Sequence, residues 1–235
     1  MAKKGNKTED QFVKIETPLS RIGKYIANNQ KNLIRIATVV VAVIVLFVGY
    51  WKFFLPSEKD AQAAMYMSEI YFQKDSFNLA LNGDGQGGVG FVDMANEYGG
   101  ISWLFDLGAT KAGDLSSYYA GLCYLHTADY ENAIKCFNDF SSDDIILSSL
   151  ALGCTGDAYM ELDNTKEALV YYKKAVSNSD NKFTAPRFMM KQAIVHEKNG
   201  NYGDALIIYK RIKADYKSSL EGNNIEKYIA IVENR

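Results

Sequence analysis

Three stretches of the sequence share one spacing of small and aromatic residues. In each, a small residue is followed three places on by an aromatic residue or histidine, twelve places on by alanine, and sixteen places on by an aromatic residue. The sets are Gly121, Tyr124, Ala133 and Phe137; Gly156, Tyr159, Ala168 and Tyr172; and Ala193, His196, Ala205 and Tyr209. A period of 35 to 37 residues predicts helical hairpins that bury their apolar faces against one another.

This spacing resembles the tetratricopeptide repeat over residues 114 to about 219, with repeats that start near residues 114, 149 and 186. The sequence departs from the family at the usual tryptophan position, which holds Ser117, Leu152 and Met189. The resemblance implies an all-α fold, a solenoid of helical hairpins. In such a fold the small residues let the two helices of a hairpin approach closely, and the aromatic residues fill the space between neighbouring hairpins.

The same spacing begins once more upstream and is then interrupted. Ser68, Tyr71 and Ala80 occupy equivalent places, but a glycine-rich segment follows where the second helix of that hairpin should continue. We therefore predict a repeat domain over residues 56–219 whose first repeat is interrupted at about 82–113. Residues 220–235 predict a C-terminal capping helix, since Ile225, Tyr228, Ile229 and Val232 fall on one helical face.

An apolar run precedes the repeats and predicts one N-terminal transmembrane helix at residues 33–55. Its central part, from Ile36 to Trp51, has no charged residue. At about 1.5 Å per residue the run is roughly 34 Å long, enough to cross a hydrocarbon core of about 30 Å. A helix of a soluble domain packed at the surface would have a polar stripe, whereas here every face is apolar. A cleavable signal peptide would have a shorter apolar run, although Ala61 and Ala63 imitate a cleavage site.

The charges on either side of this run differ in sign. Residues 1–55 carry nine Lys and Arg against three Asp and Glu, whereas residues 56–235 carry seventeen against twenty-five. Because basic residues stay on the cytoplasmic side, residues 1–32 are predicted to form a basic cytoplasmic tail. The acidic balance of the outer domain disfavours nucleic acid as a partner, since phosphate would be repelled.

The glycine-rich segment at residues 82–90 admits three interpretations. Its glycine spacing imitates a nucleotide-binding loop, but an amphipathic helix precedes it in place of a buried strand. Asp84 and Asp93 fall at two ligand positions of a calcium loop, but they are only a weak calcium candidate, because they are the only carboxylates at those positions. The interpretation we favour is a sharp excursion between two helices, since glycine reaches positive φ without penalty.

The residues that follow contain a second insertion, with the apolar cluster Ile101, Trp103, Leu104 and Phe105. Such a cluster packs onto the first hairpin or contacts a partner or the bilayer. The choice stays open from the sequence.

No set of residues predicts catalysis, a metal centre or a cofactor. The two histidines, His126 and His196, have no nucleophile or metal-ligand spacing beside them. The three cysteines lie within predicted helices, where buried thiols act as small hydrophobic side chains, although one disulfide could form in an oxidising compartment. We therefore expect a protein that is not an enzyme.

A solenoid of this kind offers a concave groove lined by the first helix of each hairpin. Projecting the repeat positions onto this groove predicts the following partner-binding residues: Leu115, Tyr118, Leu122, Leu125, His126, Asp157, Met160, Glu161, Arg187, Met190, Ile194, Glu197 and Lys198. The mixture of Met, Leu and Tyr with a few charges is typical of surfaces that bind peptide segments. Several of these residues could instead serve in packing.

The whole arrangement of a short basic tail, one span and an outer repeat domain resembles the YfgM-like family of bacterial inner-membrane proteins, and the glycine-rich interruption is similar to sequences from Bacteroidetes. The family resemblance implies an ancillary subunit of the Sec translocon that also contacts a periplasmic chaperone or an emerging polypeptide. An envelope or outer-membrane assembly scaffold without translocon contact is the alternative function.

Overall fold

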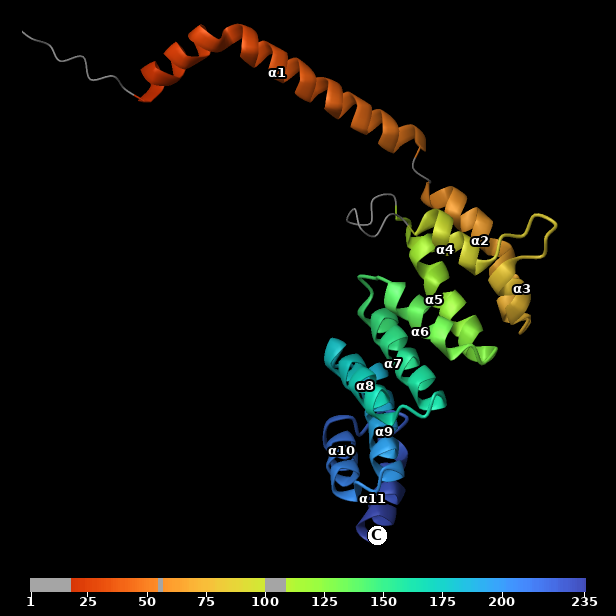
Figure 1. The fold of residues 1–235 in the computed structure, drawn as a ribbon. Coiled ribbons are helices and arrows are strands. Elements are labelled where there is room, and N and C mark those ends of the chain that lie inside the picture. The colour runs from red at the N-terminus through yellow and green to blue at the C-terminus, as the bar shows by residue number, and fades with distance from the viewer. Residues whose placement is uncertain (1–17, 55–56, 100–108) are drawn as a thin grey trace, which may run out of the picture. The chain divides into compact units, whose positions relative to one another are not determined.

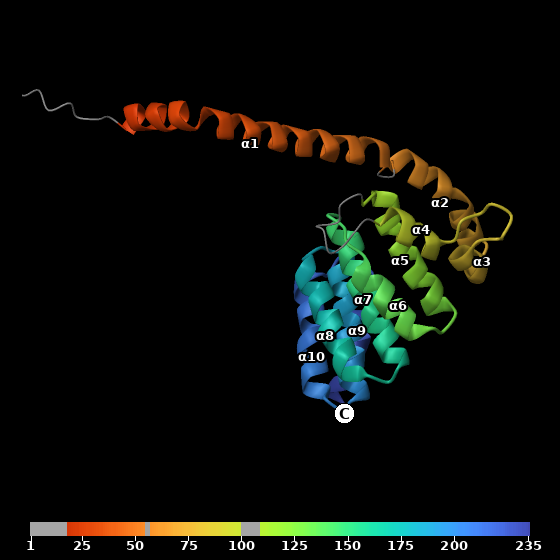
Figure 2. The same ribbon diagram turned by 45° about the horizontal axis from the view of Figure 1, so that its top comes forward.

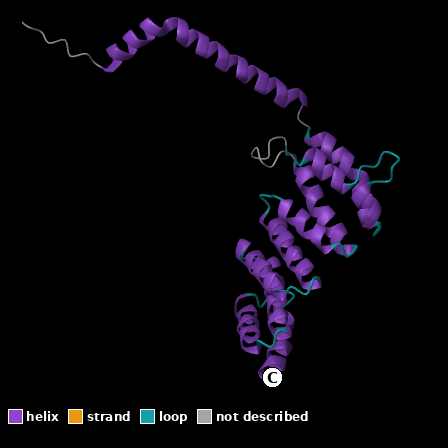
Figure 3. Cartoon of the chain, in the orientation of Figure 1, coloured by secondary structure: helices purple, strands orange, loops and turns teal. Residues whose placement is uncertain are grey.

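The computed structural model describes residues 18–54, 57–99 and 109–235, and the regular structure within these ranges is helical, with no strand (Figure 3). The chain forms two compact units, residues 1–55 and 56–235. The predicted all-α fold is therefore confirmed. The apolar cluster predicted from Ile101 to Phe105 lies outside the described residues.

The first unit contains α1, Pro18–Phe54, which begins well before the predicted span. Its segment Tyr25–Tyr50 is long and apolar enough to cross a membrane, and none of its most apolar window is buried. The helix is kinked at Asn29, whose φ of −115° is not helical and whose side-chain amide donates to the Tyr25 carbonyl at 3.0 Å.

The second unit is a series of helical hairpins that lie side by side in chain order (Figure 1). The three predicted repeats correspond to three hairpins: α5 (Lys111–His126) with α6 (Tyr130–Asp139), α7 (Ile145–Glu161) with α8 (Thr165–Asn178), and α9 (Thr184–Lys198) with α10 (Tyr202–Asp215). The short helix η2, Gly222–Asn224, and α11, Ile225–Glu233, close the C-terminal end. α11 packs on α10 and buries Ile225, Ile229 and Val232.

The same turn joins the two helices of four hairpins. In each, one residue has positive φ, and the amide of the following residue donates to a carbonyl five places back, as in a Schellman motif. The positive-φ residues are Asp75, Ala128, Asp163 and Gly200. Since the first of these turns joins α2 (Glu58–Gln73) to α3 (Phe77–Asn82), this pair begins as a repeat of the same kind.

Aromatic side chains of the second helices pack against glycines of the first. A Cβ atom added at Gly121 would lie 2.7 Å from the Phe137 ring, and one at Gly156 would lie 2.6 Å from the Tyr172 ring. The sequence led us to place these rings between neighbouring hairpins. They do contact the next hairpin, since Phe137 packs with Ala151 and Ala158 of α7 and the Tyr172 ring stacks on Phe188 of α9 with centroids 6.3 Å apart. They also pack within their own hairpins, where the glycines leave room for the rings.

Successive repeats are aligned in register. Several side-chain hydrogen bonds between them join residues 33 to 36 places apart, for example Lys191 with Asp157, Lys198 with Asp163, and Tyr171 with Asn138. A nearly constant offset means that equivalent helices run parallel, so that α7 and α9 present equivalent faces to the same side of the unit.

The glycine-rich segment is an excursion that returns to its starting point. α3 ends at Asn82, Gly83 has a φ of 76°, and a Cβ atom added at Gly90 would lie 2.1 Å from the Leu81 carbonyl oxygen. Close approach of both ends defines a compact surface loop, visible as the yellow loop in Figure 1. This geometry agrees with the favoured interpretation of the segment.

A short helix, α4 (Phe91–Tyr98), follows the loop and replaces the missing part of the second helix. Its Phe91 and Met94 are fully buried, and α2, α3 and α4 all pack on α5 (Figure 2). After α4, the backbone amide and the hydroxyl of Thr110 donate to the Tyr98 carbonyl at 2.8 and 3.0 Å. These bonds join the two ends of the second insertion.

Candidate protein-binding groove

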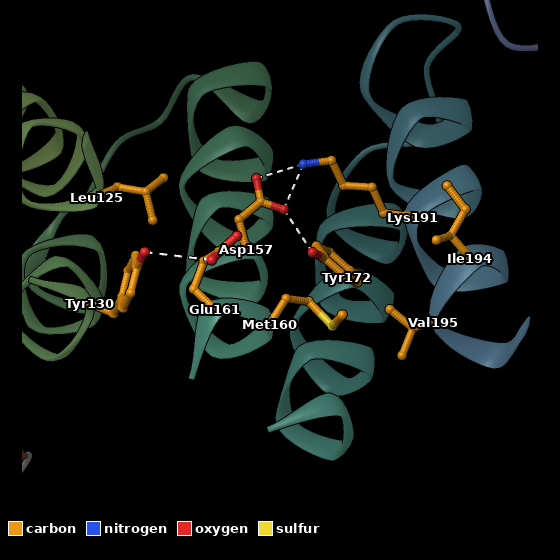
Figure 4. Close-up of a pocket in the computed structure, with 9 residues that line it drawn as sticks. All are labelled: Leu125, Tyr130, Asp157, Met160, Glu161, Tyr172, Lys191, Ile194 and Val195. Atoms are coloured by element: carbon orange, nitrogen blue, oxygen red, sulfur yellow. Dashed lines mark hydrogen bonds and ion pairs between the residues drawn. The ribbon is translucent and has the colours of Figure 1, made fainter. Parts of the chain in front are cut away.

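A groove of about 540 Å³ lies on the side of the unit that α7 and α9 share (Figure 4). Its lining residues are Leu125, Tyr130, Asp157, Met160, Glu161, Tyr172, Lys191, Ile194 and Val195. They come from the first helices α5, α7 and α9 and from the second helices α6 and α8.

Five of the residues predicted from the repeat positions line this groove: Leu125, Asp157, Met160, Glu161 and Ile194. The structure adds Tyr130, Tyr172, Lys191 and Val195, which the projection of first-helix positions omitted. The opposite charges of Asp157 and Lys191, one repeat apart, were the signal in the sequence that could have identified Lys191.

Other predicted residues serve in packing. Tyr118 is only 9% exposed, and its ring lies 5.4 Å from that of Phe140. Leu115 and Leu122 pack against the same apolar cluster, and Met190 packs against the C-terminal one. These side chains position α5 and α9 without lining the groove.

The remaining predicted residues lie on the rims or are engaged elsewhere. His126 stacks on Phe77 of the first hairpin, with ring centroids 4.3 Å apart. Glu197 accepts a hydrogen bond from the Tyr209 hydroxyl, and exposed Lys198 pairs with Asp163 at 2.8 Å. Arg187 is exposed at the start of α9.

The centre of the groove holds a bonded triad. Lys191 donates to both carboxylate oxygens of Asp157, at 2.5 and 2.6 Å, and the Tyr172 hydroxyl donates to Oδ1 at 2.7 Å. Burial, followed by the negative charge of Asp157, raises the pKa of Tyr172. The triad joins three helices, α7, α8 and α9, and leaves the centre of the groove without net charge.

The three cysteines are free thiols in packed surroundings. Burial raises the pKa of Cys154 to about 12 and that of Cys136 to about 11. Because the thiolate is the reactive form, such thiols are poor nucleophiles near neutral pH. Their surroundings are those of hydrophobic packing residues.

The two carboxylates of the weak calcium candidate, Asp84 and Asp93, lie in surroundings that differ from each other. The Asp84 carboxylate accepts hydrogen bonds from the Tyr71 hydroxyl at 2.7 Å and from the amides of Gln86 and Gly88 at 2.8 and 2.9 Å. These bonds, that of Tyr71 above all, lower the pKa of Asp84. Asp93 is exposed in the first turn of α4. Across the described ranges, no three His, Cys, Asp or Glu side chains are grouped to hold a metal ion.

The second histidine lies in the last hairpin. Nδ1 of His196 is buried without a hydrogen-bond partner and lies 3.8 Å from Asp204. The residue occupies the place of Tyr124 and Tyr159 in the other repeats, and its carbonyl accepts the turn hydrogen bond from Asn201. Its position is therefore that of a packing residue in a hairpin.

The hairpins, their turns and their spacing are those of one kind of repeat. Residues 156–182 match the model of the tetratricopeptide repeat. The match extends from the second half of α7 across α8 and thus includes Asp157, Met160 and Tyr172 of the groove. No curated protein matches the chain. Tetratricopeptide repeats typically serve as surfaces for protein–protein interaction.

Proposed function

We propose that this protein is a membrane-anchored, non-enzymatic adaptor whose tetratricopeptide domain binds segments of partner proteins in the groove. The observation that carries the proposal is the accessibility of an apolar side chain in the groove: Ile194 is 47% exposed and lines the groove together with Met160 and Leu125. Apolar side chains that protrude into a groove provide favourable burial for a bound segment.

The anchor in this proposal is the apolar helix, with residues 33–55 in the membrane. Basic residues before the helix favour a cytoplasmic N-terminus, which places the repeat domain in the periplasm of a bacterium and the anchor in its inner membrane. The resemblance of this arrangement to the YfgM-like family supports an accessory role at the Sec translocon, with a periplasmic chaperone or an emerging polypeptide as the bound partner. An envelope assembly scaffold is the alternative.

Photocrosslinking from single positions tests both the binding of partners in the groove and the accessory role at the translocon. A photoreactive amino acid at Ile194, inside the groove, should capture partners, whereas one at Ile207, which is 68% exposed on α10 outside it, should not. Translocon subunits, a chaperone or nascent chains among the Ile194 products support the accessory role. Other envelope proteins in their place support the scaffold. Equal products from both positions would contradict binding in the groove.

A further inference from the structure

The charges in the groove are arranged along its length. At the centre, Asp157 and Lys191 neutralise each other through two short hydrogen bonds. The Tyr172 hydroxyl also donates a hydrogen bond to Oδ1 of Asp157. A ligand charge at this level would have to compete with an established ion pair. The charges that can select a ligand are therefore those that have no counter-ion.

Glu161 and Arg187 are two exposed charges of this kind. Glu161 has the Tyr130 hydroxyl at 3.5 Å and no ion pair among the described residues. Arg187 likewise has no acidic partner within the described part of the chain, and it lies one helical turn before Lys191 on the same face of α9. Burial raises the pKa of the Cys154 thiol, and the Arg187 charge acts against this effect, which places Arg187 near Cys154 on α7.

The register of the repeats sets the distance between these two charges. Lys191 is level with Asp157, 34 residues before it, so Arg187 is level with residue 153 and Glu161 lies eight residues further along the groove. At a rise of 1.5 Å per helical residue, the charges are about 12 Å apart along the helix axes. Asp157 and Lys191 lie midway between these two levels, and Met160 and Ile194 lie between the levels and closer to Glu161.

An extended segment matches this spacing. In an extended chain, residues i, i+2 and i+4 share one face, and i and i+4 are about 13 Å apart. Resting on the proposed function, we propose that the groove selects an extended segment with an acidic residue opposite Arg187, an apolar residue against Ile194 and a basic residue opposite Glu161.

Four blocked peptides with identical Gly/Ser flanks test this selection. Their cores are Glu-Ser-Leu-Ser-Arg, Arg-Ser-Leu-Ser-Arg, Glu-Ser-Leu-Ser-Glu and Ser-Ser-Leu-Ser-Ser, and their binding to the full-length protein in detergent is followed by fluorescence anisotropy. The wild-type protein should bind the mixed peptide about fivefold more tightly than each of the others, the ratio expected from exposed charge pairs.

Two exposed variants change the selection in a defined way. Arg187→Glu makes both charged positions of the groove, 161 and 187, negative and should make the Arg/Arg peptide the best ligand. Glu161→Lys makes both positions positive and should favour the Glu/Glu peptide. The same order of affinities in all three proteins, or no binding of the mixed peptide, would overturn the inference.

The variant Ile194→Asp distinguishes failure of the charge selection from failure of the proposed function. If all four peptides bind equally and Ile194→Asp weakens all of them, the groove binds segments without selecting their charge, and only the present inference fails. If Ile194→Asp leaves binding unchanged, the groove is not the site and the proposed function fails too. Thermal unfolding of each variant, followed by circular dichroism, verifies that it is folded.

Discussion

The ring of Phe188 lies directly against Gly153. A Cβ atom added at Gly153 would come within 1.9 Å of Cε1 and 2.0 Å of Cζ. Phe188 is buried and belongs to the following repeat. The contact therefore sets the distance between α7 and α9, the two helices that carry Met160 and Ile194.

Replacing Gly153 should destabilise the domain. Gly153→Ala forces the buried ring to move, and overpacking of this kind costs about 1–3 kcal/mol, although alanine favours a helix by about 1 kcal/mol. Gly203→Ala is the control, because Gly203 lies in α10 and an added Cβ meets nothing within 4 Å. The control should leave stability unchanged or raise it. Urea unfolding of the full-length protein in detergent distinguishes the two, and equal effects would contradict this packing.

The repeated turns predict a pair of opposite changes. Ala128 has a φ of 62°, and Gly200 at the equivalent place has a φ of 74°. Because the left-handed conformation costs a residue with a Cβ atom about 1 kcal/mol, Ala128→Gly should stabilise the domain and Gly200→Ala should destabilise it. An added Cβ at Gly200 meets nothing within 4 Å, so the effect is conformational. Changes of the same sign in the two melting temperatures would contradict the assignment.

The triad in the groove predicts a loss of stability at alkaline pH. Burial and then Asp157 raise the pKa of Tyr172, whereas an unfolded tyrosine ionises near pH 10. The stability contributed by the neutral hydroxyl is therefore complete below about pH 10 and is lost as the pH rises above it. Tyr172→Phe should reduce the fall in unfolding free energy between about pH 9 and 11.

Tyr66→Phe is the matched control for this measurement, since Tyr66 is 60% exposed. Tyr118 and Tyr209 also have raised pKa values, so part of the alkaline loss should remain in Tyr172→Phe. A pH profile of Tyr172→Phe identical to that of the wild type would show that the triad contributes nothing.

A carboxylate at the start of the second unit caps a distant helix. Glu58 accepts hydrogen bonds from the amides of Lys111 and Ala112 at 2.7 and 3.3 Å, at the N-terminus of α5. Removing such a cap costs about 1 kcal/mol, so Glu58→Ala should lower stability by about this amount. Exposed Lys59→Ala should not. Equal unfolding midpoints for Glu58→Ala and Lys59→Ala would contradict the role of Glu58.

The hairpins could be predicted because their spacing follows from packing. Small residues such as Gly121 and Ala133 are required where two helices touch, and this requirement recurs with the repeat. α4 could not be predicted in the same way. It is short, and the burial of Phe91 and Met94 depends on a loop that brings Gly90 back to Leu81.

The groove was predicted in part for a related reason. Repeat positions indicate which face of a first helix lies on the concave side of the solenoid, and this face includes Asp157, Met160 and Ile194. They do not indicate which side chains reach across from a second helix, as Tyr172 does. Nor do they show that Phe140, beyond the end of α6, covers Tyr118.

Co-purification of the full-length protein in mild detergent, compared among wild type, Ile194→Asp and Ile207→Asp, tests the central claim most directly. If the groove holds partner proteins, the partners recovered with the wild type are lost with Ile194→Asp and retained with Ile207→Asp. Recovery of the same partners in equal amounts with all three proteins would contradict the account.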